Sequence, residues 1–372
     1  MICESISYNS YPTSNIALFE ITTEATENYS IQEKLNQKQK IIKKEKRNKK
    51  NKNISKINNI YNYTKNKPKN KNSSYNITKK VINNSLFITK NVFNIEELNI
   101  KKEFLTEILF GLKKDEKINI PFYSSNIFLL QNESEINEKH RAVLIEWLSY
   151  VVFYFSQSNE TLFMSINIMD RYITKKKISL NRYQLLGISS YLIASKYEDT
   201  NTPIITDLIF ICKNIYTYDD IISMEKDILN TLDYDIFSVS SYQFFSFFYL
   251  YTNLNNKILF CLGHLILEIC LLSIDIMSFN QSLIAIGALL IAKKSLQIKT
   301  TLSEINMIYN YTENDLKEIQ KKIVIYLNKI VYSDKNCLIL DKFEKNKYLS
   351  VAYIFKCDNK CKMCNKICYK KG

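Results

Sequence analysis

The sequence is poor in glycine and proline, with five and four of these residues in a chain of 372. Sheet-rich folds and phosphate-binding loops need glycine at their turns, so this scarcity favours a mostly helical protein. The two histidines leave little material for a catalytic triad or a His-rich metal site. Apolar residues, by contrast, make up 46% of the chain and aromatic residues 13%, which is enough to bury a sizeable core.

The net charge of +14 is concentrated in one segment. Between Lys34 and Lys80 there are 17 lysines and arginines and one acid, Glu45, so this segment alone carries +16 and the remainder −2. Such a segment cannot bury enough apolar surface to fold, and we expect it to be disordered. It is either a nuclear-localisation or polyanion-binding tract, or the product of a general bias toward Asn, Lys and Ile.

Helical periodicity begins after residue 95. The stretch "IEELNIKKEFLTEILFGLKK" is amphipathic, with Phe104, Ile108 and Leu112 on one face. Two sets of about five helical segments follow, and each contains one helix of small residues, "LLGISSYLIASK" and "LIAIGALLIAKK". The shared pattern indicates an internal repeat. Small side chains let neighbouring helices approach closely, so we expect these two helices at the centre of an all-α tandem duplication.

Four motifs in order carry a family resemblance: "INEKHRAVLIEWL", "ETLFMSINIMDRYI", "YQLLGISSYLIASKYED" and "MEKDILNTLDYDI". The first is similar to the opening of the cyclin box of mitotic (A/B-type) cyclins, and "LGHLILEICLLSIDIMSFNQSLIAIGALLIAKK" resembles the second cyclin fold. The resemblance covers about residues 100–332. It implies an all-α fold of two tandem five-helix cyclin-box domains preceded by an amphipathic N-terminal helix.

This resemblance divides the chain into five parts. They are a disordered basic Asn/Lys-rich tail (1–95), an N-terminal helix with a connecting loop (96–134), the N-terminal cyclin box (135–236), the C-terminal cyclin fold (237–335) and a Cys/Lys-rich C-terminal tail (336–372).

The resemblance implies a regulatory subunit without catalytic activity of its own. Such a subunit binds a cyclin-dependent Ser/Thr kinase as a heterodimer, activates it in cell-cycle control, and works in the nucleus and cytoplasm. By motif, the kinase contacts are Lys196 in "IASKYED" and Glu225 in "SMEKDIL", flanking the groove that receives the kinase αC helix. Without the resemblance, both residues would be ordinary charges on amphipathic helices.

The resemblance also predicts a docking patch for Arg-x-Leu motifs of substrates or inhibitors. The matching residues are Val143, Leu144, Trp147 and Gln184. His140 replaces the usual methionine, and Tyr150 stands where an acidic residue usually binds the arginine of the motif. We therefore expect weaker or altered docking. The alternative is that Trp147 is a core residue.

Arg141 and Asp170 are lone charges on successive apolar helices. The resemblance to cyclins implies that the residues at these two positions form an ion pair. Independently, two charges buried in apolar helices are tolerable only if they neutralise one another. The alternative is that Arg141 extends to solvent. We expect a structural ion pair that holds the first cyclin-box helix against the second.

Four of nine cysteines occupy the last sixteen residues, in "CDNKCKMCNKIC". Cys357, Cys361, Cys364 and Cys368 match the ligand count of a structural zinc site. In a straight helix, however, they would line one face and could not surround a tetrahedral ion. Unpaired thiols, or a lipidated or redox-active stripe, are the alternatives, and elsewhere we expect no cofactor.

Two other functions compete with kinase activation. A transcription-linked cyclin would direct its kinase to polymerase tails, whereas a basal transcription factor with the same fold would bind promoter DNA directly. Direct DNA binding needs a basic surface, which the near-neutral folded part does not offer. A membrane reading of "ILFCLGHLILEICLLSIDIM" (258–277) conflicts with His264, Glu268 and Asp275 inside it. We therefore expect neither nucleic acid nor membrane as a partner of the folded part.

Overall fold

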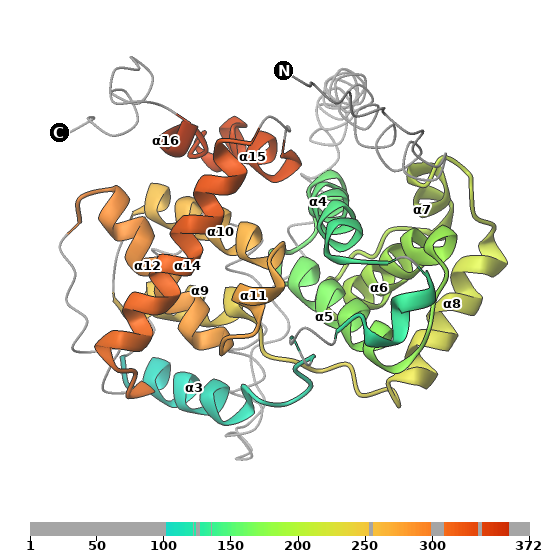
Figure 1. Ribbon diagram of the computed structural model, residues 1–372, viewed down its shortest axis with the longest axis horizontal. Helices are drawn as coiled ribbons and strands as arrows, with labels where there is room; N and C mark the ends of the chain where they lie inside the picture. The colour runs from blue at the N-terminus through green and yellow to red at the C-terminus, as the bar shows by residue number, and fades with distance from the viewer. Residues whose placement is uncertain are drawn as a thin grey trace, which may run out of the picture. The chain divides into compact units, whose positions relative to one another are not determined.

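The computed structural model describes residues 102–121, 123, 127–134, 136–252, 256–298, 309–333 and 337–356, which belong to one unit of the chain. Every regular element among these residues is a helix, and the helices form two repeats that lie side by side (Figure 1). The predicted all-α tandem architecture is confirmed.

The first repeat consists of α4 (Glu138–Tyr154), α5 (Asn159–Lys175), α6 (Tyr183–Glu198), α7 (Ile205–Ile211) and α8 (Tyr218–Thr231). The second consists of α9 (Ser241–Tyr251), α10 (Lys257–Leu271), α11 (Ile274–Met277), α12 (Gln281–Ser295) and α14 (Glu313–Val331). Two 3-10 turns, η3 (Leu129–Ser134) and η4 (Leu180–Arg182), lie in the connections before α4 and α6.

The two small-residue helices lie at the centres of their repeats, as predicted. Helix α6 contacts α5, α8 and α4, and α12 contacts α9, α10 and α14. A Cβ atom added at Gly187 of α6 would lie 2.9 Å from Leu144 Cδ1 of α4. At Gly287 of α12 it would lie 3.1 Å from Ile323 Cδ1 of α14. Glycine therefore permits the close helix packing that defines each repeat.

The helix starts follow from short-range capping. Thr217 and Asp220 form a reciprocal capping box at the start of α8. Helix α5 is capped by Ser158, whose side chain accepts a hydrogen bond from the backbone amide of Thr161. The Asn159 amide donates to the Tyr242 hydroxyl of α9, which ties the two repeats together.

Helix α3 (Lys102–Asp115) precedes the first repeat in the chain but packs on α9 of the second. The expected apolar face, with Phe104, Ile108 and Leu112, is not the buried one. Leu105 and Leu109 are buried instead, whereas Phe104 is 46% exposed. Apolar residues occur on more than one side of this helix, and the position of α9 decides which side is covered.

The contact of α3 with the second repeat is completed by Glu116, whose side chain is buried. Its Oε1 accepts a hydrogen bond from the backbone amide of Ser282, in the first turn of α12. Lys113 donates to the other carboxylate oxygen of Glu116 and to the Tyr311 hydroxyl. A carboxylate at this end of α12 satisfies a free amide and is favoured by the helix dipole.

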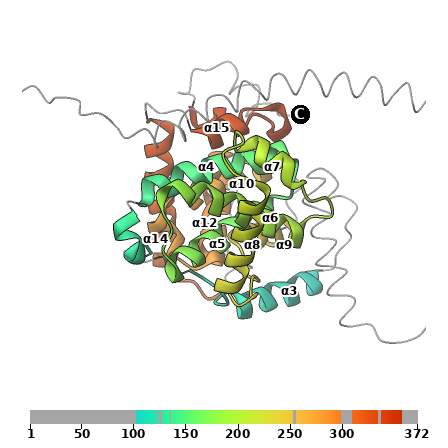
Figure 2. The ribbon, with the colours of Figure 1, turned by 90° about the vertical axis from the view of Figure 1, so that its right-hand side faces the viewer.

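Residues 337–356, which we call the strap, are folded, so the expected tail beginning at residue 336 is corrected for this stretch. The strap contains α15 (Leu338–Phe343), a 3-10 turn η5 (Asn346–Tyr348) and α16 (Tyr353–Lys356). Helix α15 packs on α4 and α10, on the side of the molecule away from α3 (Figures 1 and 2). Ile339, Phe343 and Tyr348 are buried there. The charged residues between them hid this apolar pattern in the sequence.

Candidate functional site

Arg141 and Asp170 form a bidentate ion pair between α4 and α5. Arg141 Nε donates to Asp170 Oδ1 at 2.9 Å and Nη2 donates to Oδ2 at 2.7 Å. Both side chains have 0% exposure, so Arg141 does not extend to solvent. Burial opposes the charged guanidinium, yet the adjacent carboxylate holds the pKa of Arg141 above its ordinary value. The guanidinium therefore keeps its charge, and the pair joins the first two helices of the repeat.

Two further groups complete this ion pair. Arg141 Nη1 donates to the backbone carbonyl of Leu271, at the end of α10 in the second repeat. The Tyr123 hydroxyl donates to Asp170 Oδ2 at 2.9 Å. Burial and the Asp170 charge raise the pKa of Tyr123 well above its ordinary value, so the phenol keeps its proton. Arg141 is thus a structural residue of both repeats.

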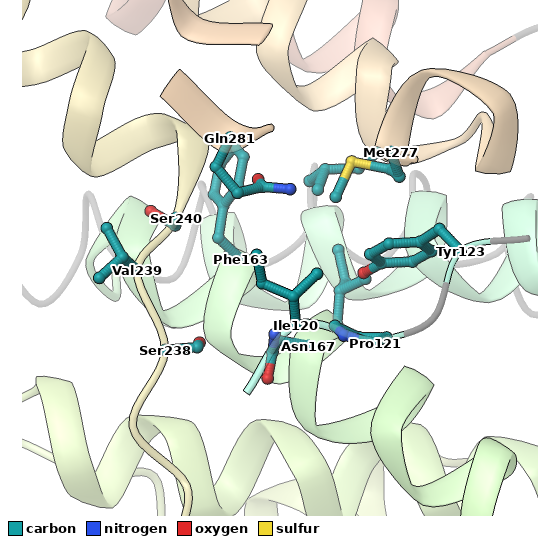
Figure 3. Close-up of a pocket in the computed structure, with 12 residues that line it drawn as sticks. Ile120, Pro121, Tyr123, Phe163, Asn167, Ser238, Val239, Ser240, Met277 and Gln281 are labelled. Atoms are coloured by element: carbon teal, nitrogen blue, oxygen red, sulfur yellow. The ribbon is translucent and has the colours of Figure 1, made fainter. Parts of the chain in front are cut away.

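A cavity lies beside this network, between α5, the segment after α3, the linker 238–240 and the part of the second repeat from the end of α10 to the start of α12 (Figure 3). Its lining includes Tyr123, Phe163, Asn167, Met277 and Gln281. Its volume is about 20 Å³, enough for one water molecule. This cavity is therefore too small for an organic substrate.

Lys196 and Glu225, the two residues expected to contact a kinase, lie together in the structure. Lys196 is at the C-terminal end of α6 and Glu225 is in the middle of α8, and Lys196 Nζ donates to Glu225 Oε1. The Lys196 side chain is 48% exposed and that of Glu225 11% exposed. The pair therefore sits at the edge of the repeat, where an incoming protein can reach it.

Apolar side chains are exposed near this ion pair in the chain. Tyr197, which follows Lys196 directly, is 52% exposed. Helix α7 packs on α8, and it begins and ends with apolar side chains in solvent: Ile204 is 63% exposed and Phe210 is 64% exposed. Large exposed apolar side chains beside a charge pair are typical of a surface that binds another protein.

The residues of the expected docking patch come together on α4 and α6, but most of them are covered. Leu144 has 0% exposure and Trp147 has 1%, whereas Val143 is half-buried. Gln184 is buried as well, and its Nε2 has no hydrogen-bond partner among the described residues. A docked peptide would therefore meet Val143 first, and peptide docking here stays a prediction.

Three carboxylates lie close together where α6 ends and α5 begins. Burial and the Glu198 charge raise the pKa of Glu160 to about 8. Burial and the Asp199 charge raise the pKa of Glu198 to about 7. Asp199 accepts hydrogen bonds from the Ser158 amide and the Thr161 hydroxyl. Glu160 therefore keeps its proton in the folded protein at neutral pH.

We expect Glu160→Gln to change how stability depends on pH. Above pH 4.5 an unfolded chain has lost this proton, whereas the folded protein holds it up to about pH 8, so rising pH destabilises the wild type across this window. The neutral glutamine removes that loss. Between pH 5 and pH 8 the variant should gain at least about 1 kcal/mol relative to wild type in urea unfolding. Glu107→Gln, on the exposed side of α3, is the control. Parallel pH profiles for wild type and Glu160→Gln would contradict this expectation.

Some predictions fall on residues that the structure does not describe. The zinc candidates Cys357, Cys361, Cys364 and Cys368 and the basic tail 1–95 lie outside the described residues. Among the residues that are described, no group of three or more His, Cys, Asp or Glu side chains is placed to hold a metal ion, and no helix is long and apolar enough to cross a membrane. Residues 258–277, the apolar stretch considered as a membrane-spanning segment, form most of α10 and all of α11, and α10 is buried within the second repeat.

Sequence reasoning missed three groups that the structure brings to the repeat interface. The Leu271 carbonyl gives no signal in a sequence, because any residue carries one. Tyr123 lies in a polar loop with no period that would indicate burial. Lys342 of the strap is 1% exposed. The sequence indicated Lys342 only indirectly. Glu268 lies in an apolar helix, α10, and a buried carboxylate needs a cation as its partner.

The comparisons with known proteins agree with this geometry. The family described as Cyclin, N-terminal domain, matches residues 107–237, and Cyclin, C-terminal domain, matches residues 239–356. The second match extends through the strap.

Individual relatives give the same result. The chain is 33% identical to Cyclin-B2-2 of Oryza sativa subsp. indica, over 60% of this chain and 52% of that protein. It is 38% identical to G2/mitotic-specific cyclin-4 of Saccharomyces cerevisiae, over 36% of this chain and 28% of that protein. Among solved structures, a viral cyclin from herpesvirus saimiri superposes with a TM-score of 0.52 at 22% identity, covering 59% of this chain and 97% of that chain. The chain matches about half the length of the first of these relatives.

Proposed function

The chain belongs to the cyclin family, and on that premise we propose that it is a regulatory subunit that binds and activates a cyclin-dependent protein kinase in cell-cycle control. The observation that carries the proposal is the Lys196–Glu225 pair on α6 and α8, in which Lys196 is exposed and Glu225 is mostly buried, together with the exposed side chain of Tyr197. Its relatives by sequence are mitotic cyclins, which favours this function over a transcription-linked one.

The proposed mechanism uses the first repeat as a docking surface. In the family, a cyclin presses the αC helix of the kinase inward, which completes a Lys–Glu ion pair in the kinase and frees its activation segment. Lys196 and Glu225 would donate and accept hydrogen bonds around that helix, and the exposed Tyr197 would pack on it. The subunit contributes position and contacts, while the phosphoryl transfer takes place on the kinase.

The docking patch on α4 would help to select the substrates that the bound kinase phosphorylates. We propose that peptides with an apolar anchor bind at Val143, beside the buried Gln184. Tyr150 cannot supply the negative charge that binds an arginine, and Lys345 lies over its ring at 5.2 Å. Arg-x-Leu peptides should therefore bind more weakly than they do to cyclins with an acidic residue at this position.

The test is a pull-down of kinase with the full chain. We expect Lys196→Ala/Glu225→Ala to lose at least about 30-fold in kinase affinity, as for a charged contact of about 2 kcal/mol at a desolvated interface. Histone phosphorylation in the recovered material should fall in parallel. The matched control is Lys322→Ala/Asp275→Ala, an ion pair between α14 and α11 of the second repeat, which should leave kinase capture unchanged.

A charge swap separates binding from folding. Lys196→Glu/Glu225→Lys keeps an ion pair within the chain but reverses the charges that a kinase would meet. It should unfold at the temperature of the wild type and still fail to capture kinase. Equal capture by wild type and swap would overturn the proposal. A captured kinase that phosphorylates polymerase-tail peptides and not histone would instead favour the transcription-linked alternative.

A further inference from the structure

The strap (337–356) joins the two repeats through a buried charge network. Lys342 Nζ, on α15, donates to both carboxylate oxygens of Glu268 on α10, at 2.5 and 2.7 Å. It also donates to the Ser149 hydroxyl of α4 at 3.0 Å, and this hydroxyl donates to Glu268 Oε2 at 2.6 Å. Three elements, one from each repeat and one from the strap, therefore meet at one carboxylate.

The network pairs one basic side chain with one acidic side chain. Lys342 and Glu268 have 1% and 0% side-chain exposure. His264 Nε2 lies 2.8 Å from Glu268 Oε1, but burial lowers the pKa of this imidazole, which keeps it neutral at pH 7. Among the described residues, Lys342 is the cation whose ammonium contacts Glu268, while Lys347, also in the strap, lies close enough to help lower the pKa of His264.

Outside this network, the strap is held along one side of α4. The backbone amide of Leu338 donates to the half-buried Glu146 carboxylate. Lys345 lies over the Phe153 ring at 4.9 Å, and Phe153 in turn contacts Tyr348. Several of these contacts lie near the surface, whereas the charge network is buried to the same depth as the apolar side chains of Ile339 and Phe343.

A charged pair at this place has a different consequence from an apolar one. If the strap detaches, Lys342 leaves with it and Glu268 loses its cover, so water hydrates both charges. Hydration repays much of the lost attraction, because bringing these charges out of water was costly in the first place. An apolar pair would gain nothing from such an exposure. The charged contact therefore has two low-energy arrangements, one paired and buried, the other separated and hydrated.

From this geometry we infer that the strap is a releasable clamp: it fixes the two repeats against each other when closed and opens locally while both repeats remain folded. Its main contacts are with α4 and α10. Lys196 and Glu225 lie on α6 and α8, so opening of the clamp leaves the proposed kinase-binding surface in place.

Hydrogen exchange of the full chain, read segment by segment, tests this inference. In the wild type the amides of α15 should exchange at least about tenfold faster than those of α12, because a local opening precedes global unfolding. Lys342→Met should increase the exchange of α15 at least about tenfold further, since it leaves Glu268 without its cation. The double variant Lys342→Met/Glu268→Leu should slow α15 to below the wild-type rate. Helix α6 should exchange alike in all three proteins.

Two outcomes would overturn the inference. If α15 and α12 exchange at the same rate in the wild type, the strap opens only when the whole unit unfolds. If the double variant exchanges as fast as Lys342→Met, the charge pair is not what makes the strap releasable. Should Lys342→Met fail to fold, Glu268→Gln provides the same comparison, because it removes the negative charge and keeps the shape.

Discussion

Replacing Arg141 by alanine is expected to lower the free energy of unfolding by about 3–5 kcal/mol, the usual effect of removing one partner from a buried ion pair. The Asp170 carboxylate would remain buried, with the Tyr123 hydroxyl as its remaining donor in this network. The Leu271 carbonyl would also lose the guanidinium that it accepts from. Urea unfolding of the full chain at pH 7, followed by circular dichroism, measures the change.

The control for this prediction is Arg182→Ala. Arg182 is exposed at the start of α6, so its removal should change stability by less than about 0.5 kcal/mol. The double variant Arg141→Met/Asp170→Leu should lose less than the sum of the two single changes, because no charge is left unpaired. A loss of about 1 kcal/mol or less for Arg141→Ala would show that the pair does not hold α4 and α5 together.

Glu268→Ala is expected to have a comparable effect, about 3–5 kcal/mol at pH 7. The variant leaves Lys342 buried without its counter-charge, and burial already lowers the pKa of that lysine. The change also leaves Ser149 without its carboxylate partner. The same urea titration measures it.

The pH dependence identifies the source of this stability. Burial opposes the charge of Glu268, but Lys342 and His264 outweigh it and lower its pKa to about 2 in the folded protein, against an ordinary value of 4.5. The contribution of Glu268 is therefore complete above about pH 4.5 and is lost as pH falls toward 2. The difference between wild type and Glu268→Ala should narrow over that range. Glu318→Ala, on the exposed side of α14, should show a constant, small difference.

The features that could be predicted from the sequence are those with a local signal. The two small-residue helices could be identified from their composition. Their small side chains predict close packing against neighbouring helices, which the structure shows at Gly187 and Gly287. Arg141 and Asp170 were conspicuous because a charge in an apolar helix needs a partner on a neighbouring helix. Lys196 and Glu225, by contrast, carried no such signal and were found through the family resemblance alone.

The features that could not be predicted depend on where distant elements lie. Leu105 and Leu109 of α3 are buried because α9, more than 130 residues later, lies on their side of the helix. The strap looked like a polar tail because its burial needs a groove that α4 and α10 form only after both repeats have folded. Trp147 and Leu144 carry the docking motif, but their coverage depends on the surrounding tertiary structure.

The hydrogen bond from Arg141 to the Leu271 carbonyl can form only late during synthesis on the ribosome, because its acceptor is made well after its donor. The donor and acceptor are separated by 130 residues. At the usual rate of translation, Arg141 and Asp170 can pair about 5–20 seconds before Leu271 leaves the ribosome. The nascent first repeat therefore holds a guanidinium with one unused donor, and the emerging second repeat supplies the acceptor that completes it.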